Sequence, residues 1–372
     1  MAMSKAKTLP EEMILDILSL LPAKFIGQFR CVSKQWRNLL SDPQFIKAHH
    51  IIHAHKKEEK LIYISVSHVL HIITFNHNPQ NGTDAISRKL NFPELPDNWL
   101  RVIGSCNGLV LVVNRQKIKY LFNPTTLKYH RIPKFHLALP AAGTCTMSGL
   151  GYDFGTDDYK VVTLSRYIGY EWTVDSTFID VYSVRMGLWR RLECIPHDHI
   201  AHHDLTHADG SGVLVNGALH WVARKAPMLQ YSSIIVAFDL TSETFSEVPS
   251  PTVFGKGNLG CYNLVALRGC LCMYITHGAN EVELWIMREY RVEESWTEFR
   301  FKGPNSVNGF IPLCLMSNDD VVLSEVIGEK LIICNMKEDQ WRDMMVDGIT
   351  SMLKRTGYFM ESLDTLLVDA IL

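Results

Sequence analysis

The chain has 372 residues, of which 47% are hydrophobic and 20% are charged, and its formal net charge is −2. This length is enough for one large or two ordinary domains, and the near-neutral charge gives no support to binding of nucleic acid or of an anionic membrane. The sequence has no run of about 18 apolar residues that could span a membrane, and its first residues lack the apolar core of a secretory signal.

The first predicted element is a short helix that ends at Pro22. Thr8 and Glu11 have the spacing of a capping box. Apolar residues at helical spacing form two stripes along this helix, Ile14, Ile17, Leu18 and Leu21 in one and Leu9, Met13 and Leu20 in the other. Further short helices are expected over 23–29 and 33–40, and a fourth begins at Asp42.

A helical unit of about 45 residues is near the lower limit of independent folding and can bury one of these stripes in its own core. The second stripe would then be an exposed apolar patch, which marks a site for a partner protein. The alternative is that this stripe packs against the rest of the same chain.

Residues 9–45 resemble the F-box, the segment that binds the Skp1 subunit of cullin-based ubiquitin ligases. The residues that carry the resemblance are Leu9-Pro10, Ile17-Leu18, Leu21-Pro22-Ala23-Lys24, Phe29-Arg30-Cys31-Val32-Ser33-Lys34 and Trp36. Two positions depart from the usual pattern, because Leu20 replaces a basic residue and Phe25-Ile26 replaces a small residue followed by leucine.

The resemblance implies that one stripe packs inward with Phe29 and Trp36 and that the other faces Skp1. It assigns the Skp1 contact to Leu9, Pro10, Ile14, Ile17, Leu18, Leu21, Pro22, Phe29, Val32 and Trp36. We expect an F-box over residues 4–50, a linker over 51–60 and a second domain over 61–368.

Beyond the linker, short β-rich runs alternate with turn residues, as in all-β proteins. Four apolar runs end in a residue that is followed seven positions later by an aromatic residue, and the pairs are Phe122 and Tyr129, Tyr182 and Trp189, Phe238 and Phe245, and Cys334 and Trp341. Trp285 and Trp296 form a longer copy, and Phe75 marks a weaker sixth copy. Asn-Gly or Arg-Gly turns precede strands at 107, 216 and 268, and they predict hairpins.

This repeat predicts about four strands in each unit of roughly 50 residues, and stacking such units in a ring buries their faces and leaves few free edges. We therefore expect an all-α F-box followed by an all-β propeller, with six blades or alternatively seven. Residues 357–368 are expected to supply a strand that closes the ring on the first blade. A pair of β-sandwiches is the alternative fold.

The second domain also resembles the kelch-like, F-box-associated domain of many plant proteins. The similar segments are residues 151–164, 215–223 and 361–363. The Gly-Gly doublets of typical kelch repeats and the Trp-Asp pair of WD40 blades are missing from the sequence. The resemblance implies a plant source and a location in the cytoplasm or the nucleus.

Candidate chemical sites are few. Five histidines at 197–207 could hold Zn²⁺, but their spacing fits no fixed frame, and a solvated loop is the simpler interpretation. Cys270 and Cys272 alternate along a predicted strand and are interpreted as buried thiols. No nucleophile elbow, phosphate loop or dinucleotide motif is present. We therefore expect neither a catalytic residue nor a bound metal or cofactor.

Tyr167, Tyr170 and Trp172 lie in a predicted connection and are candidates for target binding, because Tyr and Trp are favoured interface anchors. Packing against the blade is the alternative role for them.

Taken with the two resemblances, the sequence indicates a non-catalytic substrate-recognition subunit of an SCF (Skp1–cullin–F-box) ubiquitin ligase. Its expected partners are a Skp1-like protein, a cullin bound through Skp1, and a target protein, with no nucleic acid and no membrane. The alternatives are an F-box propeller that senses a small molecule and an enzyme built on the propeller. The target, the pathway and any part played by the histidine-rich segment stay open.

Overall fold

The structure is a computed structural model of the chain. It describes residues 11–21, 26, 29, 32–40, 42, 45, 49, 59–76, 82–135, 144–168, 174–192, 210–225, 232–251, 262–278, 280–304, 309–316, 320–325, 330–338, 340–348 and 353–360.

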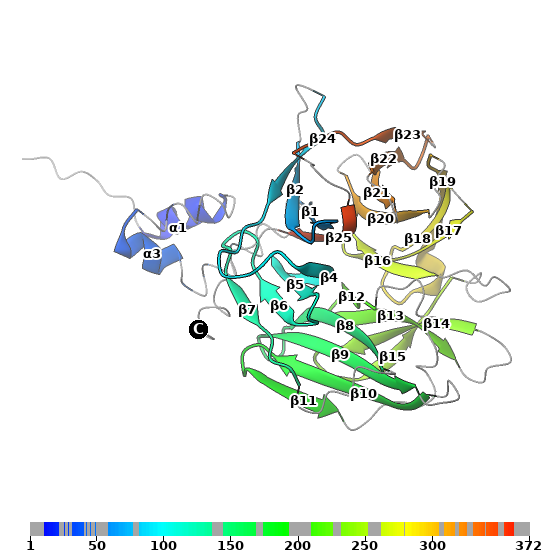
Figure 1. Cartoon of the computed structure of the whole chain (residues 1–372), viewed down its shortest axis with the longest axis horizontal. Coiled ribbons are helices and arrows are strands. Elements are labelled where there is room, and N and C mark those ends of the chain that lie inside the picture. Colours follow the sequence, from blue (N-terminus) through cyan, green and yellow to red (C-terminus); the bar gives the residue numbers. More distant parts are fainter. Residues whose placement is uncertain are drawn as a thin grey trace, which may run out of the picture.

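The described strands form six sheets arranged as the blades of a ring (Figure 1). Blade 1 contains β25 (Leu353–Met360), β1 (Glu59–Ser65), β2 (Leu70–Phe75), β3 (Ala85–Lys89) and β24 (Val346–Asp347). Blade 2 contains β4 (Trp99–Cys106), β5 (Leu109–Asn114), β6 (Lys119–Phe122) and β7 (Tyr129–Arg131). Blade 3 contains β8 (Thr144–Asp153), β9 (Asp158–Ile168), β10 (Val174–Ser183) and β11 (Leu188–Leu192).

The other three blades repeat this arrangement. Blade 4 contains β12 (Val213–Val215), β13 (Ala218–Lys225), β14 (Ser232–Asp239) and β15 (Phe245–Val248). Blade 5 contains β16 (Asn263–Leu267), β17 (Cys270–His277), β18 (Glu281–Met287) and β19 (Trp296–Lys302), with the 3-10 helix η1 (Glu293–Ser295) before β19. Blade 6 contains β20 (Phe310–Leu315), β21 (Val321–Glu325), β22 (Leu331–Asn335) and β23 (Gln340–Asp343). Of the two expected counts, six blades is therefore correct.

The ring is closed by the C-terminal strand. β25 pairs antiparallel with β1, and Glu59 lies opposite Met360. β25 also contacts β4 on one side and β20 on the other, so it is the innermost strand of blade 1. The expected closure by residues 357–368 is confirmed for 357–360, and residues 361–368 lie outside the described part of the chain.

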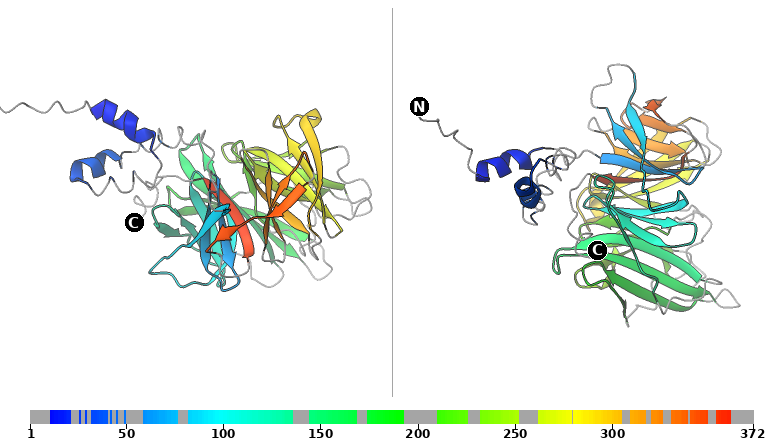
Figure 2. Two further views of the ribbon diagram at one scale, coloured as in Figure 1. Left: turned by 90° about the horizontal axis from the view of Figure 1, so that it is seen from above. Right: turned by 60° about the vertical axis from the view of Figure 1, so that its left-hand side comes forward.

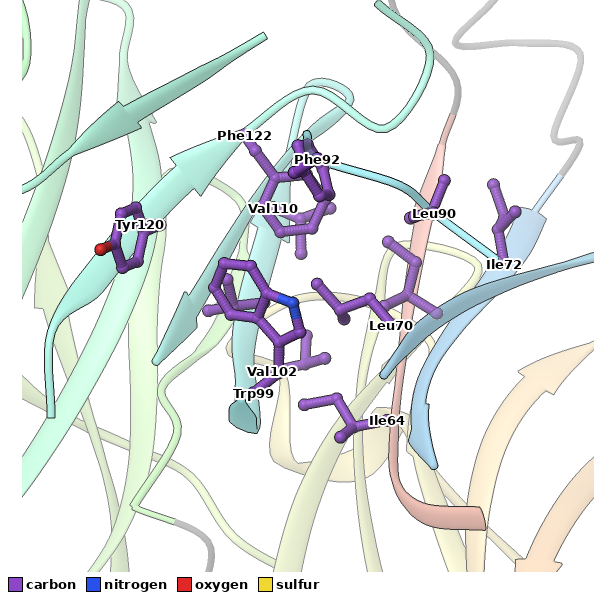
Figure 3. Packing of buried hydrophobic residues seen from close by; sticks show 12 residues of the cluster. Ile64, Leu70, Ile72, Leu90, Phe92, Trp99, Val102, Val110, Tyr120 and Phe122 are labelled. Atoms are coloured by element: carbon purple, nitrogen blue, oxygen red, sulfur yellow. The ribbon is translucent and has the colours of Figure 1, made fainter. Parts of the chain in front are cut away.

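Apolar side chains fill every contact between neighbouring blades. Six buried clusters occupy the six blade interfaces, and each draws its residues mainly from two adjacent sheets. Figure 3 shows the cluster between blades 1 and 2, where Trp99 and Phe92 meet Leu70 and Val110. A single four-stranded blade would leave both of its apolar faces in water, so the closed ring is what makes each sheet stable.

The predicted Asn-Gly turns join the first and second strands of their blades. Asn107 and Gly108 have φ angles of 48° and 77°, and Asn216 and Gly217 have φ angles of 48° and 74°. Two consecutive positive φ angles are the signature of the type I′ turn, which favours Asn and Gly and suits the twist of a hairpin.

The seven-residue repeat corresponds to the turn between the third and fourth strands. All four predicted pairs are directly opposed across this hairpin, with Phe122 opposite Tyr129, Tyr182 opposite Trp189, Phe238 opposite Phe245, and Cys334 opposite Trp341. In blade 5, Trp285 and Trp296 likewise bracket the turn between the third and fourth strands, but they are not directly opposed. Trp296 lies opposite Met287 instead, because the longer turn with η1 begins two residues later than the spacing suggested.

The N-terminal region contributes two described helices, α1 (Glu11–Ser19) and α3 (Lys34–Leu40). In Figure 1 and in both views of Figure 2 they lie beside the ring and outside it. Their own small core consists of buried Leu18, Ile26, Leu40 and Phe45. The chain therefore combines a helical N-terminal unit with an all-β propeller.

Candidate functional site

One side of α1 presents apolar side chains to solvent. Met13, Ile17 and Leu20 follow a helical spacing of four and three residues, and they are 51%, 52% and 56% exposed. Val32 of the same unit is 64% exposed. We call these four residues the apolar stripe. Burying what remains exposed of four such side chains would contribute roughly 3–6 kcal/mol to an association.

The opposite side of α1 packs into the helical unit itself. Leu18 is only 4% exposed, and Ile14, Leu15 and Leu21 are half-buried beside it. Phe29 and Trp36 pack against the same cluster, with an edge-to-face contact at 5.7 Å between ring centroids. These contacts position α1 rigidly and leave the apolar stripe on the outside.

The sequence placed Ile17 in one stripe with Ile14, Leu18 and Leu21 without saying which stripe packs inward, and the structure exposes Ile17 while it buries Leu18. At about 100° per residue, Ile17 lies at the border of the inward stripe, only about 40° from Met13. The small core is filled before it reaches that border, so Ile17 joins the exposed side with Met13 and Leu20.

Of the residues expected to contact Skp1, Ile17 and Val32 are exposed, Ile14, Leu21, Phe29 and Trp36 are half-buried, and Leu18 is buried. Leu9, Pro10 and Pro22 lie outside the described residues. Met13 and Leu20 were absent from the predicted contact set, although the second stripe in the sequence contained both.

The propeller has two distinguishable ends. In blade 2, Asn107 and Gly108 turn at one end, and the β5–β6 turn lies at the other, where the Arg115 amide donates a hydrogen bond to the Asn98 carbonyl over 3.0 Å. The first strand of blade 2 begins and its fourth strand ends at this second end, which we call the loop face. Blade 1 has the same orientation, because the Trp99 amide donates to the His68 carbonyl of the β1–β2 turn over 3.0 Å.

The first residue of β1 therefore lies at the opposite end of the ring. Glu59 is paired with Met360 there, so the chain enters the propeller from the helical unit and finishes its last described strand at the same end. We call this end the linker face. The chain from the helical unit therefore joins the ring at the end opposite to the loop face.

Of the residues expected to bind a target, Tyr170 and Trp172 fall between β9 and β10 in the chain, whereas Tyr167 falls within β9 and not in the predicted connection. The connection between β9 and β10 joins a second strand to a third strand, which puts its two described ends on the loop face. Tyr167 is the last residue but one of β9, but its side chain lies outside the described part of the structure, as do Tyr170 and Trp172. Their role stays a prediction.

The segment 151–164, one of the segments that resembled a plant domain, builds a buried charged cluster between blades 3 and 4. Lys160 Nζ lies 2.8 Å from Asp153 Oδ2 and 2.9 Å from Glu243 Oε1, and it donates to the Leu240 carbonyl over 2.6 Å. Thr241 Oγ1 donates to Asp153 Oδ1 over 2.7 Å. These partners use all three donors of the ammonium group, so the cluster joins two blades.

The pKa of the Asp153 carboxyl shows how strongly this cluster is bonded. Burial alone would raise the pKa, but hydrogen bonds from Lys160, Thr156 and Thr241 outweigh it and hold the pKa well below its usual range. The pKa of Lys160 is raised, because bonds to Asp153 and Glu243 outweigh the effect of burial. Both groups stay charged near neutral pH, as a structural ion pair requires.

The other chemical groups of interest are candidate metal ligands and thiols. Among the residues that the structure describes, no group of three or more His, Cys, Asp or Glu side chains is placed to hold a metal ion. Cys272 is a buried free thiol whose pKa is raised by burial, and Cys270 is a half-buried free thiol. The histidines at 197–207 lie outside the described residues, and within those residues no helix is long and apolar enough to cross a membrane.

Comparison with known proteins adds two family matches. Residues 7–48 match the F-box domain, and residues 55–367 match the F-box associated beta propeller domain. The F-box protein CPR1 of Arabidopsis thaliana is 31% identical over 341 residues, which cover 87% of this chain and 81% of that protein. The F-box/kelch-repeat protein At3g23880 of Arabidopsis thaliana is 29% identical, covering 78% of each chain. A chain from a crystal structure of a nidogen/laminin complex aligns with a TM-score of 0.48 and 11% identity, covering 82% of this chain and 99% of that chain.

Proposed function

The chain belongs to the F-box proteins that carry an F-box associated β-propeller domain, and on this basis we propose that it is the substrate-recognition subunit of an SCF ubiquitin ligase. The helical unit would bind a Skp1-like protein and, through it, a cullin. The propeller would hold a target protein, and the complex would act in the cytoplasm or the nucleus.

The observation that carries the proposal is the apolar stripe of Met13, Ile17, Leu20 and Val32. Exposed apolar patches of this kind mark partner sites, and the small helical core does not bury these side chains. The half-buried Ile14, Leu21, Phe29 and Trp36 of the same helical unit would complete the contact, with Leu9, Pro10 and Pro22 extending it.

The mechanism needs no bond chemistry in this chain. A ligase subunit of this kind acts by holding target lysines near a ubiquitin-carrying enzyme that other subunits recruit, which raises the effective concentration of the reacting groups. In this proposal the target binds at the loop face, where Tyr167, Tyr170 and Trp172 are the candidate anchors. The rigid ring would then set the distance between target and helical unit.

The decisive experiment compares Ile17→Asp with Leu18→Asp in binding to a purified Skp1-like protein. Ile17 is exposed, so Ile17→Asp should leave the helical unit folded and weaken Skp1 binding by about 30-fold or more, since it puts an unpaired charge into an apolar contact at a cost of roughly 2–4 kcal/mol. Leu18→Asp should instead unfold the unit, because Leu18 is in its core.

Asn38→Asp is the matched control, because it adds the same side chain at an exposed position of α3. It should bind Skp1 as the wild type does. If Ile17→Asp keeps its helical circular dichroism and still binds Skp1 with full affinity, the assignment of the apolar stripe is refuted.

A further inference from the structure

The sequence of blade 2 is strongly basic in a chain whose net charge is negative. Residues 99–135 contain no Asp or Glu and seven Lys or Arg residues, namely Arg101, Arg115, Lys117, Lys119, Lys128, Arg131 and Lys134. A cluster of like charge on one structural unit creates a local positive potential, whatever the net charge of the whole chain.

Four of these side chains lie exposed at the loop face. Arg115 and Lys117 are in the β5–β6 turn, while Arg131 ends β7 and Lys134 follows it. The Ile132 amide donates to the Lys119 carbonyl over 3.0 Å, so the end of β7 lies beside the start of β6 at the same face. None of the four forms an ion pair with a described residue. We call Arg115, Lys117, Arg131 and Lys134 the basic surface.

A further lysine lies beneath this surface. Lys119 and Arg101 are both opposite Val113 in the blade, so their side chains point to the same side, toward blade 3. Lys119 Nζ donates to Thr163 Oγ1 of β9 over 2.8 Å. Burial is the main reason that the pKa of Lys119 is lowered to about 8, and the nearby Arg101 charge adds to the effect.

The acidic groups that the structure describes nearby already have partners. Asp180, on the side of blade 3 that faces Lys119, accepts two hydrogen bonds from the Arg191 guanidinium, at 2.8 and 3.1 Å. On the connection into blade 2, Asp97 pairs with Lys89 at 2.6 Å. Glu94 accepts a hydrogen bond from Tyr129 Oη over 2.7 Å and keeps its own negative charge, which is one against the four positive charges above. The basic surface is therefore left with charge to offer a partner.

We propose that the basic surface binds a segment of the target protein that is rich in Asp and Glu side chains. This inference rests on the proposed function, since it gives a chemistry to the target that the loop face would hold. Carboxylates fit the arginine side chains well, because a guanidinium can donate two parallel hydrogen bonds to one carboxylate. Charge complementarity of this kind also accelerates association and selects against basic partners.

The test measures binding of a fluorescein-labelled peptide of Asp, Glu, Gly and Ser residues to the full chain by fluorescence anisotropy. A matched peptide with Asn and Gln in place of the acids is the ligand control. Arg131→Glu/Lys134→Glu is the test variant. Arg185→Glu/Lys337→Glu is the protein control, because it changes the net charge equally through exposed residues in turns between third and fourth strands, at the linker face.

We expect the acidic peptide to bind the wild type with an affinity that falls as salt is added, and the neutral peptide not to bind. The test variant should weaken binding by about tenfold or more, and the control variant by less than about twofold. An equal loss in both variants, equal binding of the neutral peptide, or tighter binding of a phosphoserine peptide or an RNA of the same length would overturn the inference.

Skp1 binding is measured for four proteins: the wild type, the two charge variants and Ile17→Asp. Loss of peptide binding with Skp1 binding intact supports the basic surface. A wild type that binds Skp1 but not the acidic peptide refutes this inference and leaves the proposed function standing, whereas a wild type that fails to bind Skp1 refutes the proposed function itself.

Discussion

A fully buried histidine makes the stability of the propeller depend on pH. His220 of β13 is 0% exposed, with its Nδ1 3.0 Å from the Val213 carbonyl and its Nε2 2.8 Å from Tyr290 Oη. A carbonyl can only accept, so Nδ1 carries the proton and Nε2 accepts from the tyrosine hydroxyl. Both ring nitrogens are bonded in the neutral form, and a second proton would put a charge into the contact between blades 4 and 5.

Burial is the main reason that the pKa of His220 falls from 6.5 to about 4, with a smaller contribution from the Arg291 charge. Between these two values the unfolded chain binds a proton that the folded chain does not. The free energy of unfolding therefore decreases as the pH falls below about 6.5, by about 3 kcal/mol in total and by about 2 kcal/mol at pH 5.

The assay is urea unfolding followed by tryptophan fluorescence, at about pH 7.5 and about pH 5, for the wild type and for His220→Gln. Glutamine cannot titrate, and groups elsewhere contribute equally to both proteins, so the double difference isolates His220. The advantage of wild type over variant should shrink by about 2 kcal/mol between the two pH values. A difference that is independent of pH, or that grows at low pH, would refute the reasoning.

Two further predictions concern the ring. Lys160→Met leaves Asp153 and Glu243 without their shared cation and should destabilise the propeller by roughly 3–5 kcal/mol, which lowers its thermal unfolding midpoint. Arg185→Met, at an exposed position, is the control. A loss of stability in Lys160→Met no larger than the loss in Arg185→Met would contradict the role of the cluster. Removing residues 353–372 takes away β25 and exposes the apolar faces of blades 2 and 6 to the axis, so the truncated chain should aggregate on size-exclusion chromatography. A monomeric, cooperatively unfolding truncated protein would show that the closing strand is dispensable.

Much of the architecture was readable from local sequence. The pairs Phe122 and Tyr129 or Tyr182 and Trp189 recur because one hairpin geometry recurs, and a fixed turn length places each aromatic residue opposite its partner. The turn beginning at Asn123 shows why. Its Oδ1 accepts the amides of Thr125 and Thr126, which fixes the loop through its own side chain. Where the loop is longer, as before Trp296, the residues that bracket the turn are no longer directly opposed.

The candidate site was only partly predictable. Helical spacing showed that α1 has more apolar surface than a small unit can bury, but it did not say which side turns inward. That choice depends on how Phe29, Trp36 and Leu40 fill the core, and these contacts come from other parts of the unit. The sequence therefore put both exposed Ile17 and buried Leu18 in the contact set and left Met13 and Leu20 out of it.

The basic residues of blade 2 are visible in the sequence, but their clustering at one end of the blade is not. Arg115 and Arg131 are 16 positions apart along the chain, and only the antiparallel pairing of β5, β6 and β7 brings them to one end of the blade. The separation of this end from the linker face likewise follows from the direction of β1 and its pairing with β25.

The sequence by itself determined the kinds of element, the presence of a repeat and the family, because turns, alternation and helical spacing are set by residues within a few positions of one another, and only the closed ring decided between six and seven blades. The tertiary structure decided which surfaces are free, since burial and charge at a surface depend on residues that are distant in the chain and meet only when the ring closes. The interaction surfaces proposed here, one on the helical unit and one on blade 2, are of this second kind.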